Sequence, residues 1–151
     1  MSNLGCGCPG SMARVIEREE KETGTPANAP SQLRQWPVQL HLVPPSAPYF
    51  QNAEILISAD CVAFALGSFH QDLLRGKALA IACPKLDETD AYVEKMALIF
   101  RTNEVKSITV AIMEVPCCRG LDIMVRKALD LSGKEIPLET VIVGVNGERR
   151  N

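Results

Sequence analysis

The chain has 151 residues, of which 46% are hydrophobic and 23% charged, and its formal net charge is -2. This length fits one domain with a substantial core, and the charge balance excludes the basic surface that nucleic-acid or membrane-surface partners require. No apolar run approaches the ~18 residues of a membrane span, and the N-terminus lacks the pattern of a secretory signal, so we expect a cytoplasmic protein.

The first 37 residues are predicted to form an N-terminal segment that carries two of the six cysteines. In the cytoplasm such cysteines are expected to be metal ligands or redox groups rather than disulfides. Cys6 and Cys8 lie in the glycine-rich run GCGCPGS, which suits a loop that wraps a metal or cluster. We expect a short charged helix over residues 12–22 and an irregular arm, rich in proline, over residues 23–37.

The core, residues 38–151, alternates segments typical of strands and helices. Asp87 is expected to cap the start of the second helix, and Gly133 to close the third. The alternation predicts an α/β fold of three layers, α/β/α, with a mainly parallel five-stranded sheet of the Rossmann-like or flavodoxin-like class. Strands are predicted at 38–43, 53–60, 77–83, 107–115 and 138–147, and helices within 61–76, 86–103 and 121–133.

Four cysteines occupy equivalent positions in this predicted sheet. Cys61 follows the second strand, Cys83 closes the third, and the pair Cys117 and Cys118 follows the fourth. Because parallel strands end at one edge, where open α/β sheets bind ligands, we expect these four thiols to converge. The pair also precedes a helix, whose N-terminal N–H groups are expected to stabilise a thiolate and lower its pKa.

Thiols that are far apart in the sequence favour an iron–sulfur cluster over zinc, because structural zinc prefers compact CxxC pairs and the chain has none. Other polar residues near the same edge are weaker candidates for transferring protons or binding anions, because turn capping or exposure to solvent accounts equally well for their presence. His41 is expected to be an ordinary strand residue. The chain has no GxGxxG after its first strand, no GxSxG and no P-loop. The weaker candidates are Asp60, His70, Lys85, Glu114 and Arg119.

Several longer motifs resemble a family of anaerobes known as ferredoxin or 4Fe-4S-binding proteins. They are GCPGS, SQLRQWPVQLHLVPPSAPYF, ADC at 59–61, FHQDLL, ACPKLDETDAYVEK and IMEVPCCRGL. In many members this region follows a dicluster ferredoxin module, whose CxxCxxCxxxC run is absent here. A looser likeness is to the CCG domains of heterodisulfide-reductase-type subunits, whose later CxxC is also absent. The resemblance implies an iron–sulfur cofactor of the 4Fe-4S type, with matching cysteines at Cys8, Cys61, Cys83, Cys117 and Cys118; Cys6 is a further candidate.

Three functions stay open from the sequence. The favoured one is electron transfer to or from cytoplasmic redox proteins. The second is an enzyme whose cluster has an open coordination site for a small substrate, since six cysteines exceed the four that a cubane needs. The third is a structural protein that holds zinc or no metal. No nucleic-acid or membrane partner is expected, and a homodimer is left open.

Overall fold

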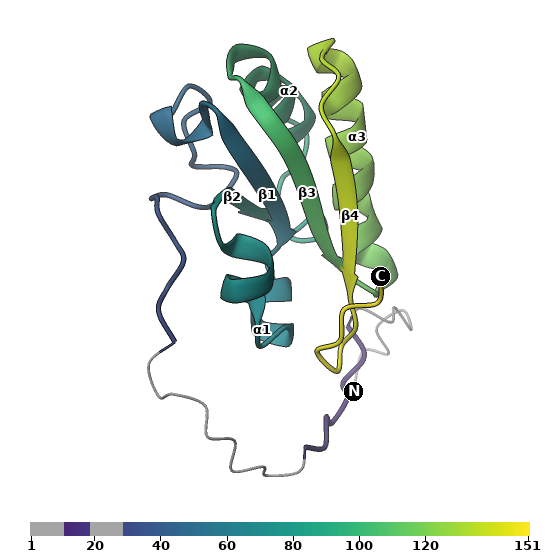
Figure 1. Ribbon diagram of the computed structural model, residues 1–151. Coiled ribbons are helices and arrows are strands. Elements are labelled where there is room, and N and C mark those ends of the chain that lie inside the picture. The colour runs from purple at the N-terminus through teal and green to yellow at the C-terminus, as the bar shows by residue number, and fades with distance from the viewer. Residues whose placement is uncertain (1–10, 19–28) are drawn as a thin grey trace.

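The computed structural model describes residues 11–18 and 29–151 (Figure 1). The four strands form one sheet in the order β2-β1-β3-β4, and every neighbouring pair is parallel. The predicted parallel α/β fold is confirmed, but across the described residues the sheet has four strands rather than five. The elements are η1 (Pro48–Phe50), β1 (Ala53–Ala59), α1 (Val62–Ala65), η2 (Phe69–Leu74), β2 (Lys77–Ala82), α2 (Tyr92–Thr102), β3 (Val105–Met113), η3 (Pro116–Cys118), α3 (Arg119–Ser132) and β4 (Leu138–Val143).

The prediction of a first strand over residues 38–43 is wrong. Only Gln39 pairs with the sheet, through a single parallel bridge to Ile81. The chain then turns, and the amides of Leu42 and Val43 donate to the carbonyl of Gln39 at 2.8 and 3.0 Å. Prolines flank the segment on both sides and cannot donate to a strand ladder, so the alternating polarity belongs to a turn that buries Val43.

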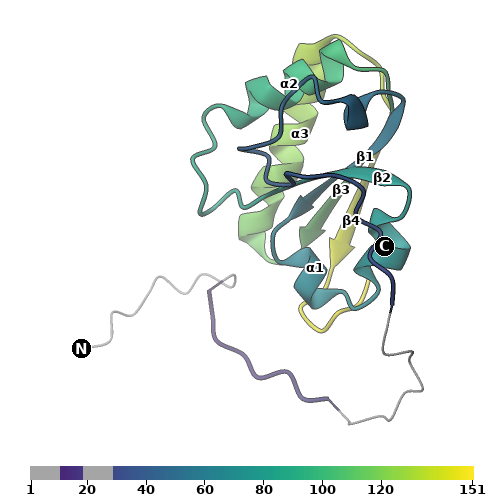
Figure 2. The same cartoon turned by 90° about the vertical axis from the view of Figure 1, so that its left-hand side faces the viewer.

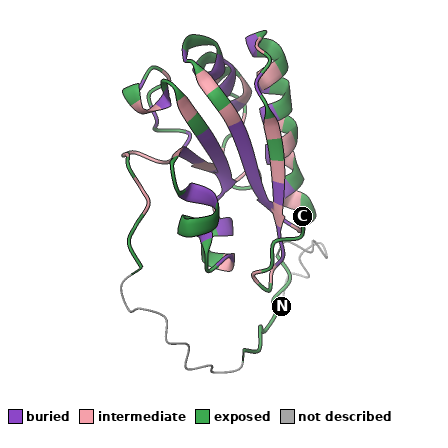
Figure 3. Cartoon of the chain, viewed as in Figure 1, coloured by how far each residue is buried: buried purple, intermediate pink, exposed green. Residues whose placement is uncertain are grey.

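The sheet has helices on both faces. Helices α2 and α3 pack together on one side, as Figure 2 shows, while α1 and η2 lie on the other side near the C-terminal ends of the strands (Figure 1). Strands β1 and β3 begin with partly exposed residues and become fully buried toward their C-terminal ends (Figure 3). The part of the chain that the structure describes has no helix with the length and apolarity to span a membrane.

Two helix predictions need correction. The helix expected over 86–103 begins only at Tyr92, so Asp87 does not cap it. The charged helix expected over 12–22 is absent from residues 12–18, and the rest of it lies outside the described residues. Val15 is exposed there, and a short segment with no buried apolar face gains too little from packing to hold a helix.

The third helix ends as expected. Gly133 follows α3 with a φ of 71°, and its amide donates to the carbonyl of Asp130. This left-handed conformation is one that glycine adopts without strain and that commonly closes a helix. The helix begins at Arg119, two residues before the predicted start, because the turn η3 leads into it directly.

Side-chain amides close both edges of the sheet. Outside β2, Gln35 accepts from the amide of Leu79 at 2.7 Å and donates to the carbonyl of the same residue at 2.8 Å. Outside β4, Asn151 accepts from the amide of Ile142 at 2.9 Å and donates to the carbonyl of Thr140 at 2.6 Å. Each amide therefore takes the place of a neighbouring strand at one edge, where unpaired backbone groups would otherwise be exposed.

Candidate functional site

The candidate site lies at the C-terminal edge of the sheet, where the connections that follow β1 and β3 lead to opposite sides. The connection from β1 leads to β2 on one side, and the connection from β3 leads to β4 on the other. The ends of β1 and β3 therefore form the switch point at which open α/β sheets bind ligands. The structure places Cys61 just after β1, Cys83 directly after β2, and Cys117 and Cys118 in η3 after β3.

The four cysteines differ in how far solvent reaches them. Cys61 is exposed and begins α1, with the amides of Phe64 and Ala65 donating to its carbonyl. Cys83 and Cys117 are half-buried, whereas Cys118 is 7% exposed and is tied back by its amide to the carbonyl of Val115. The set thus reaches from the interior of the domain to its surface.

Two segments of the site meet at Gly120. A Cβ atom on Gly120, in the first turn of α3, would lie 3.4 Å from the Cβ of Pro84, which follows Cys83. The turn after β2 therefore packs against the start of the helix that follows the cysteine pair. This contact brings segments that are far apart in the sequence to one place.

The thiols interact electrostatically. Although Cys61 is exposed, partial desolvation by the surrounding atoms raises its pKa, and the charges of Cys83, Asp60 and Cys117 raise it further. Burial likewise raises the pKa of Cys118 to about 11; a backbone hydrogen bond from Met113 opposes this, while the neighbouring Cys117 and Cys61 add to it. The charges of neighbouring sulfurs therefore oppose the ionisation of Cys61 and Cys118, as closely placed like charges do.

The expected lowering of the pKa at the cysteine pair is wrong for Cys118. Burial, together with the charges of the other thiols, outweighs the hydrogen bond from the backbone of Met113, so the pKa is raised rather than lowered. A metal or cluster would reverse this balance, because its positive charge stabilises thiolates and releases their protons. The four thiols are therefore donor groups of the type that thiophilic metals bind.

Asp87 fixes the turn that carries Cys83. Its Oδ2 atom accepts hydrogen bonds from the amide of Cys83 at 3.0 Å and from the hydroxyl of Tyr92 at 2.8 Å. The amide of Asp87 in turn donates to the carbonyl of Cys83 at 2.9 Å. Sequence reasoning missed this role, since the acidic run around Asp87 also fits the first turn of a helix. The sequence signal that could have indicated this turn is the position of Asp87 four residues after Cys83, with Pro84 between them.

The two acidic candidates have different surroundings. Burial raises the pKa of Asp60, and the charge of Asp87 adds to this. Its Oδ1 atom is buried and has no hydrogen-bond partner among the described residues. Glu114 instead accepts from the amide of Val145 and from Arg150, each at 3.1 Å, and the first of these bonds is the main cause of its lowered pKa. Its observed contacts therefore fix the loop after β4.

The remaining candidates from the sequence lie at the edge of the site or away from it. His70 accepts from the amide of Gln32 at 3.0 Å and so ties the arm to η2. His41 is exposed in a turn, which corrects its assignment to a strand. Lys85 and Arg119 are exposed beside Cys83 and Cys118.

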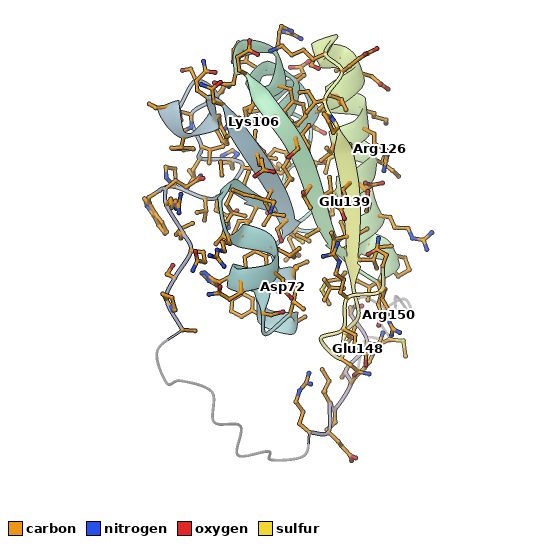
Figure 4. All side chains as sticks on the ribbon, viewed as in Figure 1. Asp72, Lys106, Arg126, Glu139, Glu148 and Arg150 are labelled. Atoms are coloured by element: carbon orange, nitrogen blue, oxygen red, sulfur yellow. The ribbon has the colours of Figure 1, made fainter. Side chains whose placement is uncertain are left out.

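The described part of the N-terminal segment lies near the same edge. Arg18 donates to the carbonyl of Asn146, in the loop after β4, at 2.9 Å, and the charge of Arg14 contributes to the lowered pKa of Glu114. Figure 4 shows Glu148 and Arg150 side by side at this end of β4, where they form an ion pair at 3.6 Å. Cys6 and Cys8 lie outside the described residues.

Across residues 11–18 and 29–151, no three His, Cys, Asp or Glu side chains are grouped so that they could hold one metal ion.

Comparison with known proteins identifies the fold family. The model of a family described as a Rossmann-like domain matches residues 47–150. The chain belongs to the Rossmann-like domain family. It is also 37% identical over 116 residues to an uncharacterized protein of Archaeoglobus fulgidus, an alignment that covers 77% of this chain and 81% of the relative. No solved structure matches the chain.

The turn after β1 carries one thiol, Cys61, and lacks the glycine-rich run of dinucleotide-binding members. The turn after the first strand of such folds holds the GxGxxG run that lets backbone approach a pyrophosphate. Here β1 is followed by Asp60 and Cys61 without those glycines. Four of the cysteines lie inside the matched region, whereas Cys6 and Cys8 precede it.

Proposed function

We propose that this Rossmann-like domain binds an iron–sulfur cluster of the 4Fe-4S type and transfers electrons to or from cytoplasmic redox proteins. The observation that carries the proposal is the arrangement of four thiols at the ends of three adjacent parallel strands, at the switch point of the sheet. Thiolates are the usual ligands of such clusters, and separate turns can supply them. The resemblance to 4Fe-4S-binding proteins of anaerobes supports the same function.

The ligands in this proposal are Cys61, Cys83 and at least one of Cys117 and Cys118. Cys8 completes the set, with Cys6 as a further candidate, since residues 11–18 already contact the loop after β4 at this edge. The bound cluster supplies one-electron redox chemistry. Its ligands would extend from Cys118, which is buried, to Cys61, which is exposed.

Two exposed apolar side chains flank the thiols and fit a docking surface for a redox partner. Phe64 is 93% exposed and lies three residues after Cys61; Leu86 is 83% exposed and lies three residues after Cys83. Protein interfaces commonly have apolar centres of this kind within a polar rim. A partner that covers these side chains would come within reach of the site.

The cluster is tested by anaerobic purification, followed by iron and sulfide analysis, absorbance at about 400 nm and EPR. We expect iron and sulfide in the wild type and a strong loss of both in Cys61→Ser, in Cys83→Ser and in a double serine variant of Cys117 and Cys118. The matched control is Ala63→Ser, an exposed position in α1 without a thiol. Wild-type iron and sulfide content in all three thiol variants would exclude the shared site.

Deletion of residues 1–10 tests the N-terminal ligand. We expect a changed EPR spectrum and a lower iron content, because the cluster loses the thiolate of Cys8. An unchanged spectrum and iron content would remove the N-terminal cysteines from the site.

A cluster-dependent enzyme is the second candidate function, and the exposure of Cys61 on the solvent side of the site favours it. Added cyanide distinguishes the two functions, because a small anion changes the EPR spectrum only where an iron has a free or exchangeable position. An unchanged spectrum supports electron transfer. Zinc without sulfide in the purified protein would instead favour the structural role.

A further inference from the structure

The turn after β2 is closed from both ends by one residue. The amide of Cys83 donates to the carboxylate of Asp87 at 3.0 Å, and the amide of Asp87 donates to the carbonyl of Cys83 at 2.9 Å. Two reciprocal hydrogen bonds therefore define the path of the backbone from one residue to the other. The direction in which the Cys83 side chain leaves the sheet depends on this path.

The same carboxylate is also attached to the helical layer. Tyr92, the first residue of α2, donates from its hydroxyl to the Oδ2 atom of Asp87 at 2.8 Å. Tyr92 is 3% exposed, so its ring is held by the core. Because one oxygen accepts from both Cys83 and Tyr92, the turn is fixed relative to α2 as well as to itself.

The carboxylate does not serve as a helix cap. The residue at the cap position of α2 is Ala91, four residues after Asp87. Its neighbours Glu88 and Asp90 are exposed acids in the same turn. All three residues are acidic, but Asp87 differs from Glu88 and Asp90 in that it is less exposed and accepts hydrogen bonds from Cys83 and Tyr92.

The negative charge of Asp87 acts on groups around the thiols. Burial is the main cause of the raised pKa of Asp60, the residue before Cys61, and of Tyr92, and Asp87 raises both pKa values further. The charge of Cys83 also acts on Tyr92. Carboxylates and thiols therefore share one electrostatic environment at this edge of the sheet.

We propose that Asp87 is a positioning residue for the cluster: it holds Cys83 in the orientation that ligation needs and adds negative charge that disfavours the reduced state. This inference rests on the proposed iron–sulfur function. Replacement of a group that orients a metal ligand by a hydrogen bond typically lowers metal affinity by ~10–100-fold. Added negative charge lowers the reduction potential, because reduction makes the cluster more negative.

The test compares four variants of the full chain: Asp87→Ala, Asp87→Asn, Tyr92→Phe and, as the matched control, Glu88→Ala. Asp87→Ala should retain its cluster about tenfold less well than the wild type. Asp87→Asn preserves an acceptor oxygen without the charge, so it should restore cluster content but shift the midpoint potential upward. Tyr92→Phe should retain less cluster than the wild type, and Glu88→Ala should match the wild type in cluster content and midpoint potential.

A second readout does not depend on the cluster. In metal-free protein, the alkylation of Cys83 by iodoacetamide is followed by peptide mass spectrometry. Asp87→Ala should alkylate faster at Cys83 than the wild type, because the turn is no longer closed, while Glu88→Ala should not.

The outcomes separate this inference from the proposed function. Wild-type cluster retention, potential and Cys83 alkylation in Asp87→Ala would overturn the inference and leave the cluster in place. A wild type that binds no cluster would refute the proposed function, and the alkylation rates would still decide whether Asp87 fixes the turn. If Asp87→Ala does not fold, the potential of Asp87→Asn decides, and an unshifted value counts against the inference.

Discussion

The buried thiol of Cys118 should make the metal-free protein sensitive to alkali. Burial is the main reason that its pKa in the folded chain is about 11, compared with 9.0 for an ordinary thiol. Below pH 9 both folded and unfolded chains bear the proton, and the contribution to stability is fully present. As the pH rises between the two values, the unfolded chain ionises and the folded chain does not, so stability falls.

The size of this loss follows from the pKa difference. One pKa unit corresponds to about 1.4 kcal/mol, so the free energy of unfolding should fall by about 1 kcal/mol at pH 10 and about 2 kcal/mol at pH 11 through Cys118 alone. Urea unfolding of the metal-free protein under reducing, anaerobic conditions measures it. The comparison is Cys118→Ala, which lacks the thiol but preserves the other ionisable groups.

The difference between wild type and variant isolates the titration. Replacing the buried sulfur changes packing by a constant amount at every pH, whereas the thiol contributes a difference that grows above pH 9. Parallel stability curves for the two proteins from pH 8 to pH 11 would show that Cys118 ionises as readily in the folded chain as in the unfolded one. The assigned burial of this thiol would then be wrong.

Three further predictions concern the fold, each measured by urea unfolding. Phe100→Ala should lower the free energy of unfolding by about 3–5 kcal/mol, because this ring of α2 is fully buried in the core. Leu98→Ala, on the partly exposed face of the same helix, should lower it much less. Gly133→Ala should cost about 1 kcal/mol, since its φ of 71° strains other residues, while Gly67→Ala, where a Cβ meets no atom within 4 Å, should be nearly neutral. Gln35→Ala should cost about 1–2 kcal/mol because it leaves the backbone groups of Leu79 unpaired; an effect below 0.5 kcal/mol would show that water replaces the amide.

Strands β2 and β3 were predictable from the sequence because their apolar runs are long and continuous. The run at 77–83 is β2 almost residue for residue, and 107–115 overlaps most of β3. The failure at 38–43 has a local cause. Alternating polarity is found both in half-buried strands and in turns with one buried side. The prolines on either side of 38–43 cannot donate to a strand ladder, and they favour the turn.

The candidate site was predictable in position but less so in chemistry. Cys61 and Cys83 follow strands, and parallel topology is sufficient to bring such residues to one edge. The pKa of Cys118 depends on burial, which the sequence does not reveal, and the contacts of Asp87 with Cys83 and Tyr92 form a local turn where the sequence predicted the start of a helix. A helix start favours thiolates in isolation, but here burial outweighs it.

The amides of Gln35 and Asn151 restrict how copies of this protein can assemble. A sheet with a bare outer strand invites a second molecule to add its own strand, which leads to extended dimers or to fibrous aggregates. Here Leu79 and Ile142, on the two outer strands, already have partners from the same chain. A homodimer would therefore have to form through helices or a face of the sheet, and growth from edge to edge would first require displacing one of these side chains.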